Sequence, residues 1–194
     1  MHGLDLLLAR QSHVMVLRVL YHADGPLTGR EVERRTGLSN RGAMLALESL
    51  VELSAVRRYV EGNAYRYTLN PDHYLVSRVL KAAFEAEDLF WTDVRKLVRK
   101  IVHPRPMAVV AAGPLARDET LAWGRMELVM LFSSGRSRIR AFASTEELRE
   151  AIQDRYGLPS VCTLLDVNIM DREEYDALWK RVAREGILLF GNLP

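Results

Sequence analysis

The sequence contains little cysteine and no long apolar run. Its single cysteine, Cys162, excludes an internal disulfide and a zinc site built from several cysteines. No uninterrupted apolar stretch approaches the roughly 20 residues that a membrane-spanning helix needs. The first residues also lack the basic and then apolar pattern of a signal peptide. We therefore expect a cytoplasmic protein that does not contact a membrane.

An excess of one charge sign is also missing. The formal net charge is +2 over 194 residues, so only the local placement of basic residues can indicate nucleic-acid binding. The five histidines are scattered without the spacing of metal ligands. A hydrophobic fraction of 48% and a charged fraction of 27% are typical of a globular protein. This length allows one large domain or two small ones.

The first seventy residues contain strong signals for helix ends. Thr28 and Glu31 have the spacing of a capping box, which begins a very short helix. Gly37 is the residue type that tolerates a left-handed helix end, and Ser39 is a good N-cap for a second helix over residues 40–53. Two helices separated by so tight a turn form a helix-turn-helix.

A predicted hairpin follows these helices. Two β-rich runs, residues 56–60 and 64–69, are joined by Glu-Gly-Asn, and a short apolar helix is predicted earlier, over residues 14–20. This order, and the stretch GREVERRTGLSNRGAMLALESLVELSAVRRYVEGNAYRYTLN, resemble bacterial winged helix-turn-helix repressors of the ArsR and MarR type. The resemblance implies a transcriptional regulator whose second helix enters the major groove of double-stranded DNA, while the hairpin wing follows the phosphates.

The expected DNA contacts lie at two places. Asn and Arg side chains can bind base edges with two hydrogen bonds, and arginines on a wing can neutralise phosphates. The predicted DNA-binding residues are Ser39, Asn40 and Arg41 at the start of the recognition helix, and Arg57, Arg58, Asn63 and Arg66 on the wing. The alternative is a protein-interaction module with a solvated basic face, which Glu48 and Glu52 on the same helix favour because they would repel phosphate.

The middle of the chain is predicted to be helical. Residues 73–102 contain no glycine or proline, and apolar residues recur at helical spacing, with a possible break near Glu87 and Asp88. A helix of this length beside a winged helix often forms a dimer interface, so we expect a homodimer. The predicted division is a DNA-binding domain over 1–71, a helical linker over 72–104 and a third domain over 105–194.

The last ninety residues alternate between predicted strands and helices. Strands are expected over 107–112, 126–132, 161–169 and 186–191, with helices over 144–156 and 171–184 and an arginine-rich turn over 133–138. This alternation indicates an α/β domain with a small mixed sheet, so the whole chain is predicted to be α+β.

After the strand over 107–112 the loop reads Gly-Pro-Leu-Ala-Arg-Asp-Glu over residues 113–119, and Gly-Arg-Met-Glu over 124–127 leads into the next strand. This arrangement resembles the minimal nucleotidyltransferase domain over about residues 107–191. Active members have a loop Gly-Ser-x-Ala-Arg-Gly-Glu, followed by a strand that begins Ser-Asp-x-Asp. Here Gly113, Ala116, Arg117 and Glu119 match the loop. The resemblance implies that the loop holds a triphosphate and that the two strand carboxylates hold metal ions for phosphoryl transfer.

The departures from this pattern all oppose catalysis. Pro114 replaces the serine and supplies neither a hydroxyl nor a backbone N–H, and Asp118 adds negative charge where phosphates would approach. Arg125 occupies the first metal-ligand position, which leaves Glu127 as the remaining strand carboxylate and Asp166 as a loosely placed third one. A cation at this position repels a divalent ion. We therefore predict a catalytically inactive pseudoenzyme without metal or cofactor.

If the nucleotidyltransferase-like domain is inactive, two interpretations of its altered motif stay open. In one, Arg125 pairs with Glu127 and the domain is only structural. In the other, Gly113, Arg117 and Arg125 bind a nucleotide or another anion without transferring anything, which would give the regulator an effector.

A third interpretation keeps the enzyme active. In it, Asp118 and Glu119 join Glu127 in a shifted metal site. The chain would then be a nucleotidyltransferase of the toxin–antitoxin type, which uses Mg²⁺ and a nucleoside triphosphate to modify a protein or a small molecule.

Overall fold

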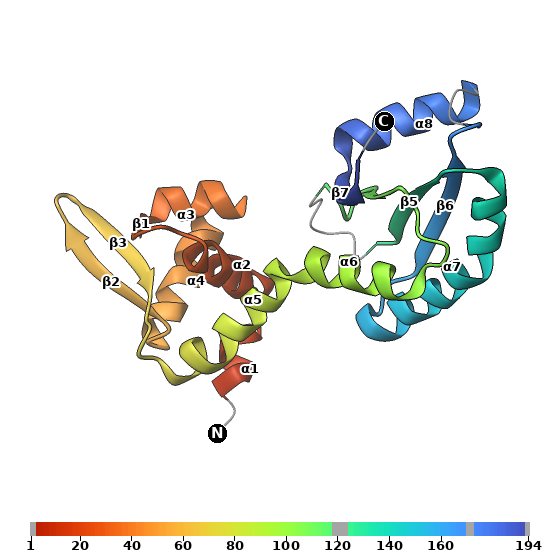
Figure 1. Ribbon diagram of the computed structural model, residues 1–194. Helices are drawn as coiled ribbons and strands as arrows, with labels where there is room; N and C mark the ends of the chain where they lie inside the picture. Colours follow the sequence, from red (N-terminus) through yellow and green to blue (C-terminus); the bar gives the residue numbers. More distant parts are fainter. Residues whose placement is uncertain (1–2, 118–123, 170–172, 193–194) are drawn as a thin grey trace. The chain divides into compact units, whose positions relative to one another are not determined.

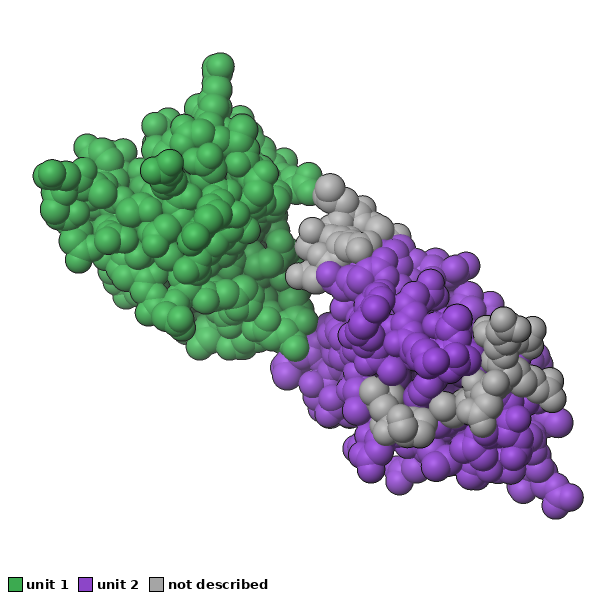
Figure 2. All heavy atoms as spheres, turned by 90° about the horizontal axis from the view of Figure 1, so that it is seen from above, with its two compact units in different colours: residues 1–88 green, residues 89–194 purple. Residues whose placement is uncertain are grey.

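The chain folds into two compact units, Met1–Asp88 and Leu89–Pro194 (Figures 1 and 2). The computed structural model describes residues 3–117, 124–169 and 173–192. Helices and two separate small sheets make the protein a mixed α+β chain. No helix among the described residues is both long and apolar enough to cross a membrane.

The first unit combines helices with a three-stranded antiparallel sheet of order β1-β3-β2. Its elements are α1 (Gly3–Leu8), α2 (Gln11–Tyr21), β1 (Leu27–Thr28), α3 (Gly29–Thr36), α4 (Asn40–Glu52), β2 (Val56–Glu61), β3 (Ala64–Leu69), the π-helical turn η1 (Val76–Leu80) and α5 (Lys81–Asp88). The predicted order of two adjacent helices and a hairpin is therefore present, while α1 and β1 were not predicted.

The predicted helix ends of this unit are confirmed. The Thr28 hydroxyl accepts a hydrogen bond from the Glu31 backbone N–H, and the Glu31 carboxylate accepts one from the Thr28 backbone N–H. Gly37 ends α3 with a φ of 69°. Ser39 caps α4 by accepting from the Gly42 N–H. These local contacts fix the turn between α3 and α4.

The core of the first unit lies where α2, α3 and α4 meet the sheet. Leu17, Val32, Leu47, Leu50 and Tyr67 are almost completely buried there. The three helices also pack against one another. The N-terminal end of α4 stays outside this core.

The helical residues between the two sheets are shared by both units. The helix breaks after Asp88, and α6 (Phe90–Ile101) begins two residues later. Phe84 of α5 packs in the core of the first unit, whereas Val94 and Val98 of α6 pack in the second. The segment expected to form one linker, residues 72–104, therefore contributes to two different cores.

The second unit is built around a mixed four-stranded sheet of order β6-β5-β4-β7. Its strands are β4 (Ala108–Ala112), β5 (Met126–Phe132), β6 (Ser160–Asp166) and β7 (Ile187–Gly191), and its helices are α6, α7 (Gly135–Tyr156) and α8 (Glu173–Glu185). β5 and β6 are parallel, and the other two pairs are antiparallel. The structure thus contains the small mixed sheet that the sequence predicts.

The side chains of β5 point alternately to the two faces of the sheet, and each face is covered by a separate apolar layer. Leu128 and Met130 pack with α6 and α7 on one face, and Val129 and Leu131 pack with α8 on the other. Successive side chains of a strand point to opposite faces, so Glu127 belongs to the face that α8 covers. This geometry decides which helix borders the site.

One predicted element is wrong. Residues 133–138 do not form an arginine-rich turn before a helix that starts at Ser144, because α7 already begins at Gly135. Ser134 caps it by accepting from the Ser137 N–H. Ser144 lies inside the helix, where its hydroxyl accepts from the His103 N–H instead of capping. The glycine suggested a turn, but the arginines after it form helix readily.

Candidate functional site

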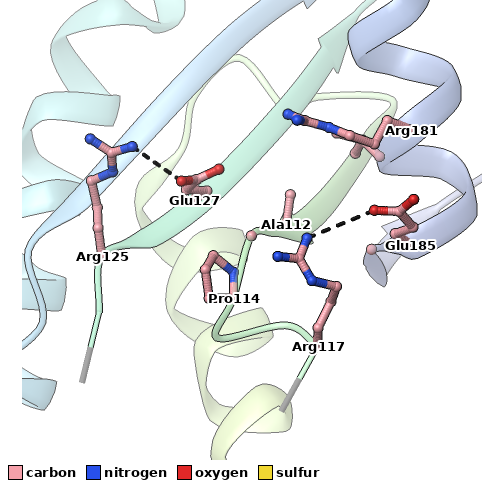
Figure 3. A pocket seen from close by; sticks show the side chains of 10 residues that line it. Ala112, Pro114, Arg117, Arg125, Glu127, Arg181 and Glu185 are labelled. Atoms are coloured by element: carbon pink, nitrogen blue, oxygen red, sulfur yellow. Dashed lines mark hydrogen bonds and ion pairs between the residues drawn. The ribbon is translucent and has the colours of Figure 1, made fainter. Parts of the chain in front are cut away.

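A pocket of about 310 Å³ lies between the end of β4, the start of β5 and α8 (Figure 3). Ala112 and Gly113 are part of its wall. Its charged lining residues are Arg117, Arg125, Glu127, Arg181 and Glu185. The structure therefore brings together Gly113, Arg117 and Arg125, the three residues predicted to bind a nucleotide or anion, and places Glu127 among them.

Gly113 and Glu127 are in close contact in this pocket. Ala112 pairs with Glu127 across the two antiparallel strands, so the glutamate side chain lies beside the next residue of the loop. Gly113 has a φ of 80°, and a Cβ atom there would lie 3.0 Å from the Glu127 carboxyl carbon. The backbone conformation therefore favours glycine, and an added Cβ atom would also have to shift the Glu127 carboxyl group.

The loop after β4 uses its backbone donors internally. The N–H groups of Ala116 and Arg117 both donate to the Gly113 carbonyl, at 3.1 and 3.3 Å. Pro114 has no N–H to offer. Pro114, Ala116 and Arg117 therefore provide no free backbone donor for a phosphate, so the charged groups of the pocket that can meet an anion are its arginine side chains.

Two ion pairs connect the charged groups of the pocket. Arg125 Nη2 lies 3.1 Å from Glu127 Oε1, and Arg117 Nη1 lies 3.7 Å from Glu185 Oε2. Arg184 also donates to Glu185, and this hydrogen bond is the main reason why the pKa of Glu185 is lowered. The positive charges of Arg117 and Arg181 lower this pKa further. Glu185 is therefore stabilised in its ionised form by the arginines around it.

The described part of the pocket does not fit a divalent metal ion. Its strand carboxylate, Glu127, is paired with the Arg125 guanidinium, which repels a cation. No group of three histidine, cysteine, aspartate or glutamate side chains suited to a metal occurs among the described residues. The alternative ligands Asp118 and Glu119 lie outside the described residues.

Asp166 is not part of this site, which corrects the prediction of a third carboxylate. In the parallel pairing of β5 and β6, Asp166 lies opposite Phe132, at the far end of β5 from Glu127. Five residues of strand separate the two ends by roughly 17 Å. Asp166 is buried there, and its Oδ2 lies 2.9 Å from Arg138 Nε. Its surroundings are those of a structural ion pair.

The residues predicted to contact DNA are exposed, except for the half-buried Arg66. Ser39 serves as the cap of α4, and Asn40 Nδ2 donates to Glu33 Oε2 at 2.8 Å. Arg41 is exposed in the first turn of α4. The start of this helix therefore presents a polar surface to solvent, with one side chain already held by a carboxylate.

The hairpin residues also have partners within the chain. Arg57 pairs with Asp72, and the Arg58 guanidinium carbon lies 4.8 Å from the centre of the Tyr65 ring. Arg66 Nε lies 2.8 Å from Glu61 Oε2, and Arg66 Nη1 lies 3.4 Å from Glu31 Oε2 of α3. Asn63 lies in the exposed turn between β2 and β3.

Arg181 and Glu185 of the pocket were not predicted from the sequence. They are four residues apart on α8, so both lie on one side of this helix, and Glu185 directly precedes Gly186. That spacing is visible in the sequence, but it does not reveal that α8 covers the face of the sheet on which Glu127 lies. Only the long-range packing of α8 on β4 brings these residues into the pocket.

Comparisons with known proteins give weak similarities. No protein-family model matches the chain, and no curated protein matches it. A crystal structure of a toxin–antitoxin with AMP-PNP is 16% identical, with a TM-score of 0.37, over 53% of this chain and 73% of that chain. The toxin–antitoxin MntA-HepT is 18% identical, with a TM-score of 0.35, over 54% and 73%.

Human N-acetylserotonin methyltransferase in complex with SAM is also similar, at 19% identity and a TM-score of 0.31, over 50% of this chain and 30% of that chain. TM-scores this low do not decide between the possible functions, which rest on the geometry of the two units.

Proposed function

We propose that the N-terminal unit is a winged helix-turn-helix that binds double-stranded DNA and that the chain regulates transcription. The observation that carries this proposal is the exposed first turn of α4, with Asn40 and Arg41, in a unit where a tight turn joins α3 to α4 and the β2–β3 hairpin follows. In winged helices the corresponding turn contacts base edges in the major groove.

The ion pairs on this surface are compatible with DNA binding. The Arg57 and Asp72 side chains are 50% and 80% exposed, and ion pairs so exposed contribute only about 0–1 kcal/mol. A phosphate can therefore replace the carboxylate of Asp72 or of Glu61. Residues 1–88 contain eleven basic and eleven acidic side chains. Affinity for DNA therefore has to come from individual side-chain contacts, because the net charge of this unit supplies little long-range attraction to DNA.

A DNA-binding measurement on the full chain tests this proposal. We expect genomic fragments selected by gel shift to bind with an affinity that falls as salt rises. Arg41→Ala should weaken binding by about 1–3 kcal/mol and relax sequence preference. Arg78→Ala, which changes an exposed arginine of η1, is the matched control and should bind normally. Absent or salt-independent binding would contradict the proposal.

We also propose that the DNA-binding form is a homodimer. Two recognition helices could then contact half-sites one helical turn apart. Analytical ultracentrifugation with and without a bound fragment checks this, and a palindromic binding site with that spacing is the expected companion result. One protein chain per fragment would contradict the dimer but not DNA binding.

For the C-terminal unit, we propose an anion-binding pocket that transfers nothing. The observation that favours it is the guanidinium of Arg125 beside Glu127, at the place where the first metal ligand stands in the nucleotidyltransferase pattern. Arg117 and Arg181 border the same pocket. Three fixed positive charges can bind phosphate groups without the divalent ion that such a site otherwise requires.

Calorimetry with ATP and with inorganic pyrophosphate tests the pocket. We expect binding in EDTA, and at least a tenfold loss in Arg125→Ala, because charge-assisted hydrogen bonds contribute about 1.5–3 kcal/mol. Incubation with labelled ATP and Mg²⁺ or Mn²⁺ should give no transfer. Metal-dependent transfer that Glu127→Ala abolishes would instead favour an active nucleotidyltransferase of the toxin–antitoxin type.

A further inference from the structure

Two arginines of the pocket are each paired with a carboxylate of the same chain. Arg125 has Glu127 at 3.1 Å, and Arg117 has Glu185 at 3.7 Å. The pairs come from different elements, as Figure 3 shows: the first from the start of β5, the second from the loop after β4 and from α8. An entering anion would therefore meet arginines that already have partners.

We propose, building on the anion-binding pocket, that Glu127 and Glu185 are internal competitors for its ligand. An anion with two negatively charged groups displaces both carboxylates and takes their places beside Arg125 and Arg117. The ligand chemistry that fits is a diphosphate group, either free or at the end of a nucleotide. These two glutamates then set both the affinity and the preference for a ligand with two anionic groups.

The exposure of the four side chains makes this exchange inexpensive. Glu127 and Glu185 are 30% and 34% exposed, and Arg125 and Arg117 are 58% and 38% exposed. A displaced carboxylate therefore returns to water at little cost. Glu185 also keeps its 2.6 Å contact with Arg184 when Arg117 takes another partner. The longer pair, Arg117 with Glu185, is the one we expect to open first.

The number of pairs determines the preferred ligand. A single anionic group can replace one carboxylate and leaves the other pair closed. Two linked groups replace both carboxylates. Arg181, which lines the same pocket, adds positive charge and belongs to neither of these two ion pairs. Pyrophosphate should therefore bind more tightly than orthophosphate.

The test measures binding of inorganic pyrophosphate to the full chain by calorimetry, in EDTA and about 0.15 M salt, where surface charges beyond roughly 8 Å are screened. We expect Glu185→Gln and Glu127→Gln each to bind about three- to fivefold more tightly than wild type, since each removes one exposed ion pair. Asp176→Asn removes the same charge from α8, where Asp176 pairs with Lys180 instead, and should leave binding unchanged.

A further variant tests whether strengthening the hold of Glu185 on Arg117 weakens ligand binding. Arg184→Ala leaves Glu185 with Arg117 as its contacting partner and should weaken pyrophosphate binding, whereas Lys180→Ala removes a positive charge of the same helix without this effect. Circular dichroism melts of all variants confirm that each is folded. Comparison of ADP with pyrophosphate shows whether a nucleoside contributes.

Each outcome has a distinct meaning. Binding by wild type that both glutamine variants leave unchanged or weaken would overturn the internal competition while leaving the anion pocket intact. Equal strengthening by Asp176→Asn would overturn it as well, because the effect would then be general electrostatics. No pyrophosphate binding by any variant would overturn the anion pocket itself.

Discussion

Gly113 combines two requirements that other residues of the pocket do not share. Its φ of 80° lies in the left-handed region, and a Cβ atom at this position would lie only 3.0 Å from the Glu127 carboxyl carbon. Gly157, at the end of α7, has a similar φ of 65° but nothing within 4 Å of a Cβ position. A comparison of alanine variants at Gly113 and Gly157 therefore separates the free-energy cost of a left-handed backbone from the cost of crowding Glu127.

We expect Gly157→Ala to lower the free energy of unfolding of the second unit by about 1–2 kcal/mol, the cost of a left-handed conformation with a Cβ. Gly113→Ala should cost roughly another 1 kcal/mol, because the added methyl group has to push Glu127 aside. Urea denaturation of the two variants measures the difference. Equal losses would mean that the carboxylate moves freely and does not depend on Gly113 for its position.

Between elements, Asp93 of α6 forms polar contacts with α7, beside the apolar packing of the two helices. Asp93 Oδ2 accepts hydrogen bonds from Arg155 Nη2 at 2.6 Å and from Tyr156 Oη at 3.1 Å. The hydrogen bond from Arg155 is the largest cause of the lowered pKa of Asp93, followed by the one from Tyr156. Burial, together with Asp93, raises the pKa of Tyr156 to about 12. Both helices thus share a contact whose strength depends on ionised Asp93.

This contact predicts a pH dependence of stability. Because the pKa of Asp93 is lower when folded than when unfolded, its stabilising effect is present above the unfolded value of about 3.9 and is lost as pH falls through the lowered value. Asp93→Asn should therefore be less stable than wild type at pH 6 and similar near pH 2. Urea denaturation across this range measures the two curves.

The control for this pH series is Asp154→Asn, which changes an exposed aspartate of the same α7. The free energy of unfolding of this variant, plotted against pH, should run parallel to that of wild type. If Asp93→Asn also runs parallel to wild type down to low pH, the aspartate does not stabilise the α6–α7 contact through its charge.

For the molecule as a whole, local features were predictable and long-range ones were not. The capping box of Thr28 and the hairpin after α4 depend on residues a few positions apart, so the sequence contains the information. Part of the pocket lining was also predictable, since Gly113 and Arg125 lie on the loop and the strand that resemble the nucleotidyltransferase pattern. The winged-helix interpretation of the first unit stays a prediction.

What could not be predicted depends on how distant elements pair. Asp166 looked like a possible partner of Glu127 because both are carboxylates on strands, but the parallel register of β5 and β6 puts them at opposite ends. Arg181 and Glu185 enter the pocket only because α8 packs on the face of the sheet that contains Glu127. Neither the register nor the choice of face is encoded in the residues near these side chains.

The separate cores of the two units predict separate unfolding. Leu47 and Leu148 are each 0% exposed, the first in the core of unit 1 and the second in that of unit 2. Truncating a buried leucine to alanine costs about 2–5 kcal/mol, or on the order of 10 °C in a unit of this size. In calorimetry of the full chain, Leu47→Ala should lower the unfolding temperature of the first unit. Leu148→Ala should lower that of the second unit.

The same pair of variants connects stability to the two proposed activities. At a temperature between the shifted and the normal transition, Leu47→Ala should lose DNA binding and keep pyrophosphate binding, because only its first unit is unfolded. Leu148→Ala should show the reverse. If either substitution instead lowers both transitions together, the two cores stabilise each other, and a ligand in the pocket would then strengthen DNA binding through the folded population of the first unit.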